Sequence, residues 1–334
     1  MVFCSLIRTF DLRSKVGCTS EKQNKFLISF GFSLGLHYFD LRSKVLSLEK
    51  SQIKFGFLLA YSYLCSMKYT LNIRGQLVDL SQPQVMGILN ATPDSFFAGS
   101  RQQTEDEVAR RANEIVEQGG TMIDVGAYST RPGHVEVSEA EEMERLRRAL
   151  KVVRREQPNV VLSVDTFRAD VARMVVEEYG ADIINDVSEG EDANMFRTVA
   201  RLGVPYILMS VQPDLRTTLL AFAKKVQMLR DVGQKDIILD PGFGFGKTVE
   251  QNYRLMNEME KLLVLGLPLL VGISRKSMIF KLLGTTPDES LNGTTVLNTI
   301  ALMKGVSILR VHDVKEAVEC VRITAATKPQ HTEP

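Results

Sequence analysis

The feature that most limits what this chain can fold into is an alternation of short apolar runs with longer segments of helical periodicity. Eight such runs follow Met67, and the segments between them, such as residues 105–120 and 168–182, carry apolar residues at helical spacing and glycine at the expected stop. This alternation predicts parallel βα units and a (β/α)8 TIM barrel over residues 67–325. The predicted strands are residues 85–89, 121–125, 160–164, 182–184, 206–209, 236–239, 269–273 and 307–311.

Two competing interpretations fail on local sequence patterns. A doubly wound open sheet would place G-x-G-x-x-G after the first run, and that pattern is absent there. The stretch "DIILDPGFGFGKT" resembles a phosphate-binding loop, but the pattern G-x-x-x-x-G-K-[ST] requires glycine where this chain has Pro241, which lacks an N–H. The loop is therefore interpreted as presenting Asp240 at a strand end.

A polar side chain stands within or just after every predicted strand. Any one of them could cap a helix or begin a turn. In a barrel, however, the strand ends converge on one mouth, where catalytic groups sit. The whole series therefore predicts a single site, whose members are Asn90, Asp124, Asp165, Asn185, Ser210, Asp240, Ser274, Arg275, Lys276, Arg310 and His312.

The acidic and amide residues of this series indicate a flat heterocyclic ligand. Asp165, Asn185 and Asp240 show no metal-ligand spacing, and buried carboxylates require hydrogen-bond donors. An aminopyrimidinone ring presents N–H beside NH2 and would bind a carboxylate bidentately, as arginine does. Lys276 is placed to donate to a carbonyl or ring nitrogen of that ligand; a solvated loop lysine is the alternative.

The basic residues indicate an anion such as phosphate. Arginine's planar fork matches phosphate oxygens, which Arg131 and Arg310 would bind, and His312 adds a donor on the same side of an extended strand as Arg310. Packing at the barrel mouth is the alternative for His312. Asn90 offers an oxygen to Mg²⁺, which prefers few protein ligands and several phosphate or water oxygens.

Composition limits the partners and the compartment. The net charge of +1 argues against a surface for nucleic acid or another polyanion. Beyond residue 66 the only cysteine is Cys320, so a disulfide framework and a Cys-based zinc site are excluded there, as suits the cytoplasm. The longest apolar patch of the first 66 residues, residues 55–65, is too short to span a membrane.

The first 66 residues differ from the rest, because "FDLRSKV" occurs twice, at residues 10–16 and 39–45. We interpret residues 1–66 as a leader upstream of the true start at Met67; a transit peptide is the alternative. Residues 326–334 are predicted to be a polar C-terminal tail.

Seven ordered blocks carry a family resemblance: "VMGILNATPDSF", "MIDVGAYSTRPG", "SVDTFRADVA", "GADIINDV", "LDPGFGFGKT", "LVGISRKSMI" and "ILRVHDV". Together they resemble the dihydropteroate synthase family, from about Arg74 to Val321. The resemblance implies a transferase of folate biosynthesis that condenses 6-hydroxymethyl-7,8-dihydropterin pyrophosphate with 4-aminobenzoate, with Mg²⁺ as cofactor. It also implies a homodimer and competition by sulfonamides.

The resemblance further implies roles for individual residues. The pterin is held by Asp165, Asn185, Asp240 and Lys276, with Arg275 over its face and Phe245 in its wall. The pyrophosphate is held by Asn90, Arg131, Arg310 and His312, with Asn90 at the metal, and the 4-aminobenzoate by Thr130, Pro132 and Ser277. Catalysis is expected from Asp124, Asp165, Asp240, Lys276, Arg310 and His312, with Asp124 in the magnesium and water network.

Two departures and two alternatives accompany this interpretation. Tyr128 stands where the family commonly has an acid, and Ser210 stands where a histidine is frequent. A corrinoid-linked methyltetrahydrofolate methyltransferase would want the same pterin residues but not the Arg131, Arg310 and His312 cluster. A catalytically silent pterin-binding homologue would act as a binding module.

Overall fold

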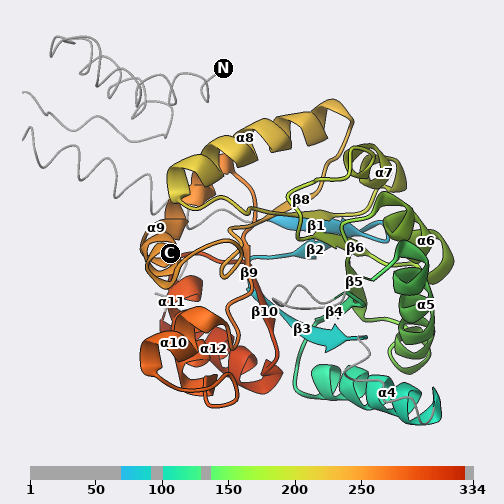
Figure 1. The fold of residues 1–334 in the computed structure, drawn as a ribbon, viewed down its shortest axis with the longest axis horizontal. Helices are drawn as coiled ribbons and strands as arrows, with labels where there is room; N and C mark the ends of the chain where they lie inside the picture. The colour runs from blue at the N-terminus through green and yellow to red at the C-terminus, as the bar shows by residue number, and fades with distance from the viewer. Residues whose placement is uncertain (1–68, 92–100, 129–136, 328–334) are drawn as a thin grey trace, which may run out of the picture. The chain divides into compact units, whose positions relative to one another are not determined.

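Eight parallel strands form one sheet, and the predicted strands are confirmed. The computed structural model describes residues 69–91, 101–128 and 137–327. Each strand is followed along the chain by one or more helices, which surround the strands in Figure 1. The strands are β3 (Gln84–Asn90), β4 (Met122–Gly126), β5 (Val161–Asp165), β6 (Ile183–Asp186), β7 (Tyr206–Met209), β8 (Ile237–Asp240), β9 (Leu270–Val271) and β10 (Ile308–Val311).

The helices fill the predicted connections and begin and end where the local sequence dictates. Ser138, Asp214 and Thr248 accept backbone N–H bonds at the starts of α5, α8 and α9. Gly180 and Gly203 end α6 and α7 in the left-handed conformation. The helices are α4 (Arg101–Glu117), α5 (Glu139–Glu156), α6 (Ala169–Tyr179), α7 (Met195–Leu202), α8 (Leu215–Asp231), α9 (Val249–Glu258), the 3-10 helix η4 (Met259–Leu265), α10 (Ser277–Leu283), α11 (Leu291–Met303) and α12 (Val314–Thr327).

The sheet runs in the order β8-β7-β6-β5-β4-β3-β10-β9 and nearly closes. Its last junction is a single parallel bridge between Leu239 of β8 and Leu269, just before β9. There the Leu239 N–H donates to the carbonyl oxygen of Pro268 at 2.9 Å. The result is a TIM-barrel-like fold in which all strand ends face the same mouth.

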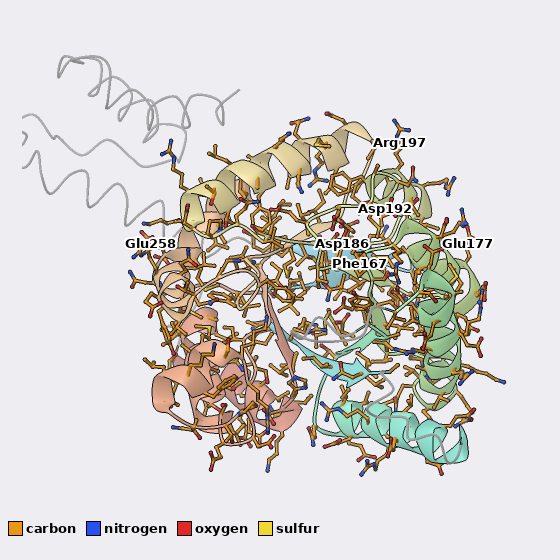
Figure 2. The ribbon with its side chains drawn as sticks, viewed as in Figure 1. Phe167, Glu177, Asp186, Asp192, Arg197 and Glu258 are labelled. Carbon is orange, nitrogen blue, oxygen red and sulfur yellow. The ribbon has the colours of Figure 1, made fainter. Side chains whose placement is uncertain are left out.

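Side chains alternate along each strand between the barrel interior and the helical layer. Along β4, Met122 and Asp124 face inward, while Ile123 and Val125 pack in the large outer core beneath the helices. The outer faces of the helices carry charged side chains such as Glu177 and Arg197 (Figure 2). Apolar residues therefore fill the lower interior, and polar ones stand near the mouth.

A hairpin that the sequence analysis did not anticipate covers the lower end of the barrel. β1 (Thr70–Ile73) pairs antiparallel with β2 (Gln76–Asp79) through a turn in which Arg74 and Gly75 have positive φ. Its Leu71 and Ile73 pack against the first inward residues of the strands, among them Met86 and Ile308. The hairpin thus seals the end opposite the mouth.

One buried carboxylate fastens this hairpin to the barrel. Asp182 accepts from Nε and Nη2 of Arg74, each at 2.7 Å, and from Nη2 of Arg154 at 3.1 Å. It also accepts from the backbone N–H of Leu162 at 2.9 Å. Asp182 therefore joins the hairpin, α5 and the start of β5.

The leader predicted for residues 1–66 lies outside the described residues, as does most of the tail predicted from residue 326; α12 continues to Thr327. No helix in the described part of the chain is both long and apolar enough to cross a membrane.

Candidate active site

The barrel brings five of the predicted polar residues to one mouth. Asp124, Asp165, Asn185, Asp240 and Arg310 lie in the upper halves of β4, β5, β6, β8 and β10. All of them face inward, because each is an even number of residues from an apolar inward neighbour lower in its strand. Parallel strands in one register make this convergence unavoidable.

Arg310 is the centre of this group. Its Nε lies 2.6 Å from Oδ2 of Asp124, and its Nη2 lies 3.1 Å from Oδ2 of Asp165. Asp124 is fully buried and also accepts from Oγ of Ser163 at 2.5 Å and from Nδ2 of Asn185 at 3.1 Å. The guanidinium predicted to bind an anion is thus held by two carboxylates, one of which, Asp165, belongs to the set predicted for the heterocycle.

The loop after β8 shapes a second part of the mouth. Its Gly242 and Gly244 have positive φ, and a Cβ at Gly242 would overlap the carbonyl oxygen of Ser210. This tight path directs the Phe243 carbonyl oxygen to the Lys276 ammonium, which donates to it. The ammonium also lies 4.6 Å from the centre of the Phe245 ring.

Lys247, the lysine of the glycine-rich stretch, stabilises this path. Its Nζ donates to the carbonyl oxygens of Ser210 at 3.2 Å, Gly242 at 2.9 Å and Phe245 at 3.2 Å. Burial lowers the pKa of the Lys247 ammonium to about 8. The stretch that resembles a nucleotide loop therefore uses its lysine on its own backbone.

Burial shifts the titration of the groups at the mouth. Burial raises the pKa of the Asp165 carboxyl to about 7, although the charge of Arg310 acts to lower it. Burial also raises the pKa of Asp240, and there the charge of Lys276 acts to lower it. Burial lowers the pKa of the Lys276 ammonium to about 8, opposed by Asp240. It also lowers the pKa of His312 to about 4, and Arg310 adds to that shift, so His312 is neutral at pH 7.

One buried atom of this site lacks a partner. Oδ1 of Asn185 accepts no hydrogen bond from any residue that the structure describes. An unpaired buried acceptor is costly, so this position favours a ligand that brings an N–H. The Asp165 and Asp240 carboxylates at the same mouth also favour ligand N–H groups, although each already accepts one hydrogen bond, from Arg310 and from the Gly242 N–H respectively.

The predicted anion residues are only partly described. Asn90 ends β3 with an exposed side chain. The backbone N–H of His312 donates to Oγ of Ser274 at 3.2 Å, and the backbone carbonyl oxygen of His312 accepts from Nη2 of Arg111 at 2.6 Å. These bonds fix the backbone that carries the imidazole. Thr130, Arg131 and Pro132 lie outside the described residues, and Ser277 is the first residue of α10.

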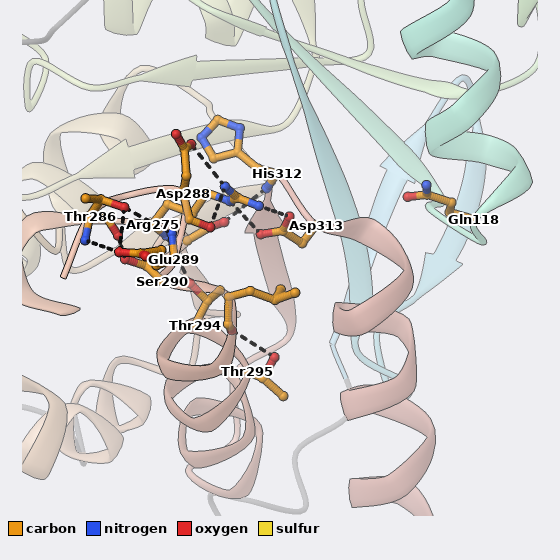
Figure 3. A network of polar contacts seen from close by, with 12 residues as sticks. Gln118, Arg275, Thr286, Asp288, Glu289, Ser290, Thr294, Thr295, His312 and Asp313 are labelled. Atoms are coloured by element: carbon orange, nitrogen blue, oxygen red, sulfur yellow. Dashed lines mark hydrogen bonds and ion pairs between the residues drawn. The ribbon is translucent and has the colours of Figure 1, made fainter. Parts of the chain in front are cut away.

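Arg275, expected over the pterin face, makes a different contact in this structure. Its Nε and Nη2 donate to the two carboxylate oxygens of Asp313 at 3.0 and 2.8 Å, beside His312 (Figure 3). Its backbone has φ +55°, and its N–H donates to Oγ1 of Thr294 at 3.1 Å. The pair joins the loop after β9 to the loop after β10.

Sequence reasoning missed the residues that hold others in place. Ser163, Lys247 and Asp313 make the contacts described above, and their signals were small: an inward serine, the lysine of "GKT" and the acid after His312. Arg168 is another, since it pairs with the buried Glu142 and donates to the carbonyl oxygen of Val137 at 2.8 Å. The Tyr128 ring, a departure from the family pattern, packs edge-on against Phe167 with centroids 5.2 Å apart.

Comparison with known proteins agrees with this geometry. The family of pterin binding enzymes matches residues 86–312. The dihydropteroate synthase of Escherichia coli K12 is 39% identical over 269 residues, covering 76% of this chain and 95% of the relative. That of Bacillus subtilis is 38% identical over 252 residues, covering 72% and 87%.

Solved structures give the same result. Xanthomonas albilineans dihydropteroate synthase with 4-aminobenzoic acid matches with TM-score 0.72 and 33% identity, covering 79% of this chain and 100% of that one. The Yersinia pestis enzyme with a sulfonamide drug complex matches with TM-score 0.71 and 39% identity, covering 78% and 99%. The fold, the convergent mouth and these relatives place the chain in the pterin-binding enzyme family, among the dihydropteroate synthases, which are transferases of folate biosynthesis.

Proposed function

We propose that this mouth condenses 6-hydroxymethyl-7,8-dihydropterin pyrophosphate with 4-aminobenzoate, and that its residues divide between the two ends of the first substrate. The observation that carries this division is the contact of Arg310 with Asp165 at 3.1 Å. It puts a base suited to a diphosphate directly beside an acid suited to an aminopyrimidinone. One small molecule can therefore engage both.

The pterin end is assigned to the two carboxylates of the mouth and to Asn185. Asp240 and Asp165 accept from the N–H and NH2 groups of the ring, and the unpaired Oδ1 of Asn185 accepts another. Such donors favour the ionised carboxylates and so oppose the raised pKa values of Asp165 and Asp240. Lys276 donates to the ring carbonyl or a ring nitrogen, and Phe245 forms the wall. Arg275 would cover the ring only after leaving Asp313.

The pyrophosphate end belongs to Arg310, Arg131, His312 and Asn90. A neutral His312 can donate one N–H to a phosphate oxygen. Among the described residues there is no group of three or more His, Cys, Asp or Glu side chains suited to a metal ion. Asn90 would hold Mg²⁺ through its amide oxygen, since this ion prefers few protein ligands beside phosphate and water oxygens. When bound, Mg²⁺ neutralises charge on the leaving pyrophosphate.

The chemistry then follows from charge. The C–O bond at the methylene breaks, its electron pair leaves with pyrophosphate, and positive charge spreads into the electron-rich dihydropterin ring. Asp165 and Asp240 stabilise that charge, while Arg310, Arg131 and His312 stabilise the departing anion. The amine nitrogen of 4-aminobenzoate forms the new C–N bond and releases a proton to water or pyrophosphate. Positioning supplies much of the remaining acceleration.

The 4-aminobenzoate site is assigned to Thr130, Pro132 and Ser277. Ser277 follows Lys276 directly, so it borders the pterin end of the mouth. The Xanthomonas relative holds 4-aminobenzoic acid and the Yersinia relative a sulfonamide drug complex. By extension, this protein is expected to bind 4-aminobenzoate and to be inhibited by sulfonamides.

A homodimer belongs to the same proposal, and α11 is its expected interface. No charged residue occurs from Leu291 to Met303. Yet Val296, Ile300 and Met303, spaced along one face, are 50%, 37% and 56% exposed. Apolar side chains gathered on one exposed face of a helix mark an interaction surface, so a second copy is the occupant we assign to this face. The cytoplasm, a reducing compartment, suits the buried free thiol of Cys320.

The test is release of pyrophosphate that requires both substrates and Mg²⁺. Lys276→Ala and Arg310→Ala should each lower kcat/KM by about a hundredfold, the loss expected for a charge-assisted contact. Lys281→Ala and Arg322→Ala remove exposed cations nearby in the chain and serve as matched controls. Wild-type protein that binds a pterin but releases no pyrophosphate would be a silent homologue. Near-normal turnover of both Lys276→Ala and Arg310→Ala would contradict the assignments.

A further inference from the structure

Asp124 occupies a position between the two ends of the site that the expected magnesium and water network does not explain. Its side chain is fully buried on β4. Oδ1 accepts from Ser163, and Oδ2 accepts from both Asn185 and Arg310. All three partners belong to other strands of the barrel interior. A carboxylate so enclosed by protein donors is poorly placed to hold a metal at the mouth.

The contact with Asn185 decides which way its amide faces. The NH2 and oxygen of an amide are interchangeable in shape, so the surrounding groups fix its orientation. Asp124 when ionised can only accept, and its Oδ2 lies 3.1 Å from Nδ2 of Asn185. The amide oxygen, Oδ1, must therefore face the other way, where it is buried without a partner among the described residues. Asp124 thus makes Asn185 an acceptor for the pterin.

The contact with Arg310 decides how the guanidinium lies. Nε is held by Asp124 at 2.6 Å and Nη2 by Asp165 at 3.1 Å. Because the guanidinium is planar, two fixed donors set its plane and leave the remaining N–H groups for an anion. The same oxygen of Asp124 therefore orients one residue of each half of the site.

Resting on the proposed function, we propose that Asp124 is a positioning residue that couples the pterin half to the pyrophosphate half through Asn185 and Arg310. Its loss weakens both halves at once, although it touches neither ligand. Ser163 supports the opposite oxygen and takes no part in the coupling.

The experiment compares Asp124→Asn with Ser163→Ala. Two binding constants are measured by calorimetry, for 6-hydroxymethylpterin alone and for inorganic pyrophosphate with Mg²⁺. The asparagine variant removes the negative charge that holds Asn185 and Arg310; its amide oxygen can face their donors only as a neutral acceptor, with its NH2 turned to Oγ of Ser163. Each ligand should therefore bind about tenfold to a hundredfold more weakly, as when a charged acceptor is lost. Ser163→Ala should change either constant by about threefold or less, because Oδ2 keeps its donors.

A double-mutant cycle distinguishes coupling from general damage. In an Asn185→Ala background, Asp124→Asn should cost pterin binding little more, since the acceptor it orients is gone. It should still weaken pyrophosphate binding in full. The Mg²⁺ concentration for half-maximal turnover should stay within about twofold of wild type, because no metal ligand is lost.

Several results would overturn the proposal. One such result is that Asp124→Asn weakens the binding of only one of the two ligands. Another is that the effects of Asp124→Asn and Asn185→Ala on pterin binding add up. A large shift in Mg²⁺ dependence would assign Asp124 to the metal instead. If Asp124→Asn does not fold, Asp124→Ser carries the same measurements, and thermal unfolding of each variant checks the fold. Wild-type turnover is recorded first, so an inactive wild type would refute the proposed reaction and not this inference.

Discussion

The loop after β8 allows a test in which two substitutions each place alanine at a positive φ and differ in the side chain that the new Cβ meets. Gly244 and Gly246 have φ of +83° and +61°, so alanine at either position costs about 1–2 kcal/mol in the left-handed region. A Cβ at Gly244 would lie 2.9 Å from Cδ of Lys276. A Cβ at Gly246 would meet only the carbonyl oxygen of Val211, at an ordinary 3.5 Å.

The difference between the two variants can be worked out from that contact. Relief at Gly244→Ala requires the Lys276 side chain to shift, which disturbs the contacts of its ammonium with the Phe243 carbonyl oxygen and the Phe245 ring. A charge-assisted hydrogen bond contributes about 1.5–3 kcal/mol. If the pterin bond of Lys276 is lost, pterin binding should weaken by about tenfold to a hundredfold in Gly244→Ala. Gly246→Ala should bind the pterin within about threefold of wild type.

The assay is calorimetric titration with 6-hydroxymethylpterin, paired with thermal unfolding of each variant. Both variants should lose stability, because both place alanine at a positive φ, and the unfolding measurement separates that loss from the change in pterin affinity. The reasoning would be refuted by equal pterin affinity in the two variants. It would also be refuted by a Gly246→Ala protein that binds more weakly than Gly244→Ala.

Three further outcomes are expected. Asp182→Asn should lower the free energy of unfolding by about 3 kcal/mol, because it disrupts a buried carboxylate that accepts from four donors. The control, Asp170→Asn, breaks an exposed ion pair with Arg173 and should lower it by less than about 1 kcal/mol; both values are measured by urea unfolding. Folding lowers the pKa of His312 from 6.5 to about 4, so the unfolded chain binds a proton at this residue more readily than the folded protein does. The contribution of His312 to the free energy of unfolding therefore rises between about pH 4 and 6.5. That rise should vanish in His312→Gln when unfolding is measured across this pH range. Ile300→Glu should give monomers by sedimentation, whereas Leu220→Glu, on exposed surface of α8, should not; a dimer in both would disprove the α11 interface.

The parts of the fold that depend on local pattern were predictable from the sequence. Apolar runs at βα spacing identified every barrel strand, since a strand buried on both faces needs such a run. Convergence of Asp124, Asp240 and Arg310 followed from the fold alone. The hairpin was missed because its strands are short and only half apolar, although the Arg74–Gly75 turn was a usable signal.

Directions of side chains could not be predicted in the same way. That Arg275 lies on Asp313, and that Asn185 turns its NH2 to Asp124, depend on partners far away in the chain. Periodicity reports which face a residue occupies and not which neighbour it selects. The functions of Ser163 and Lys247 are of the same kind, because each is defined by what it holds.

The junction between β8 and β9 has a consequence for how substrate and barrel influence each other. A single bridge at Leu239 closes the cylinder there, and β9 itself spans only Leu270 and Val271. Asp240 is the last residue of β8, on one side of this junction, and Lys276 follows β9, on the other side. A heterocycle gripped from both sides would act as an additional cross-link at the place where the wall separates most easily. Substrate would then complete the protein's architecture as well as occupy it.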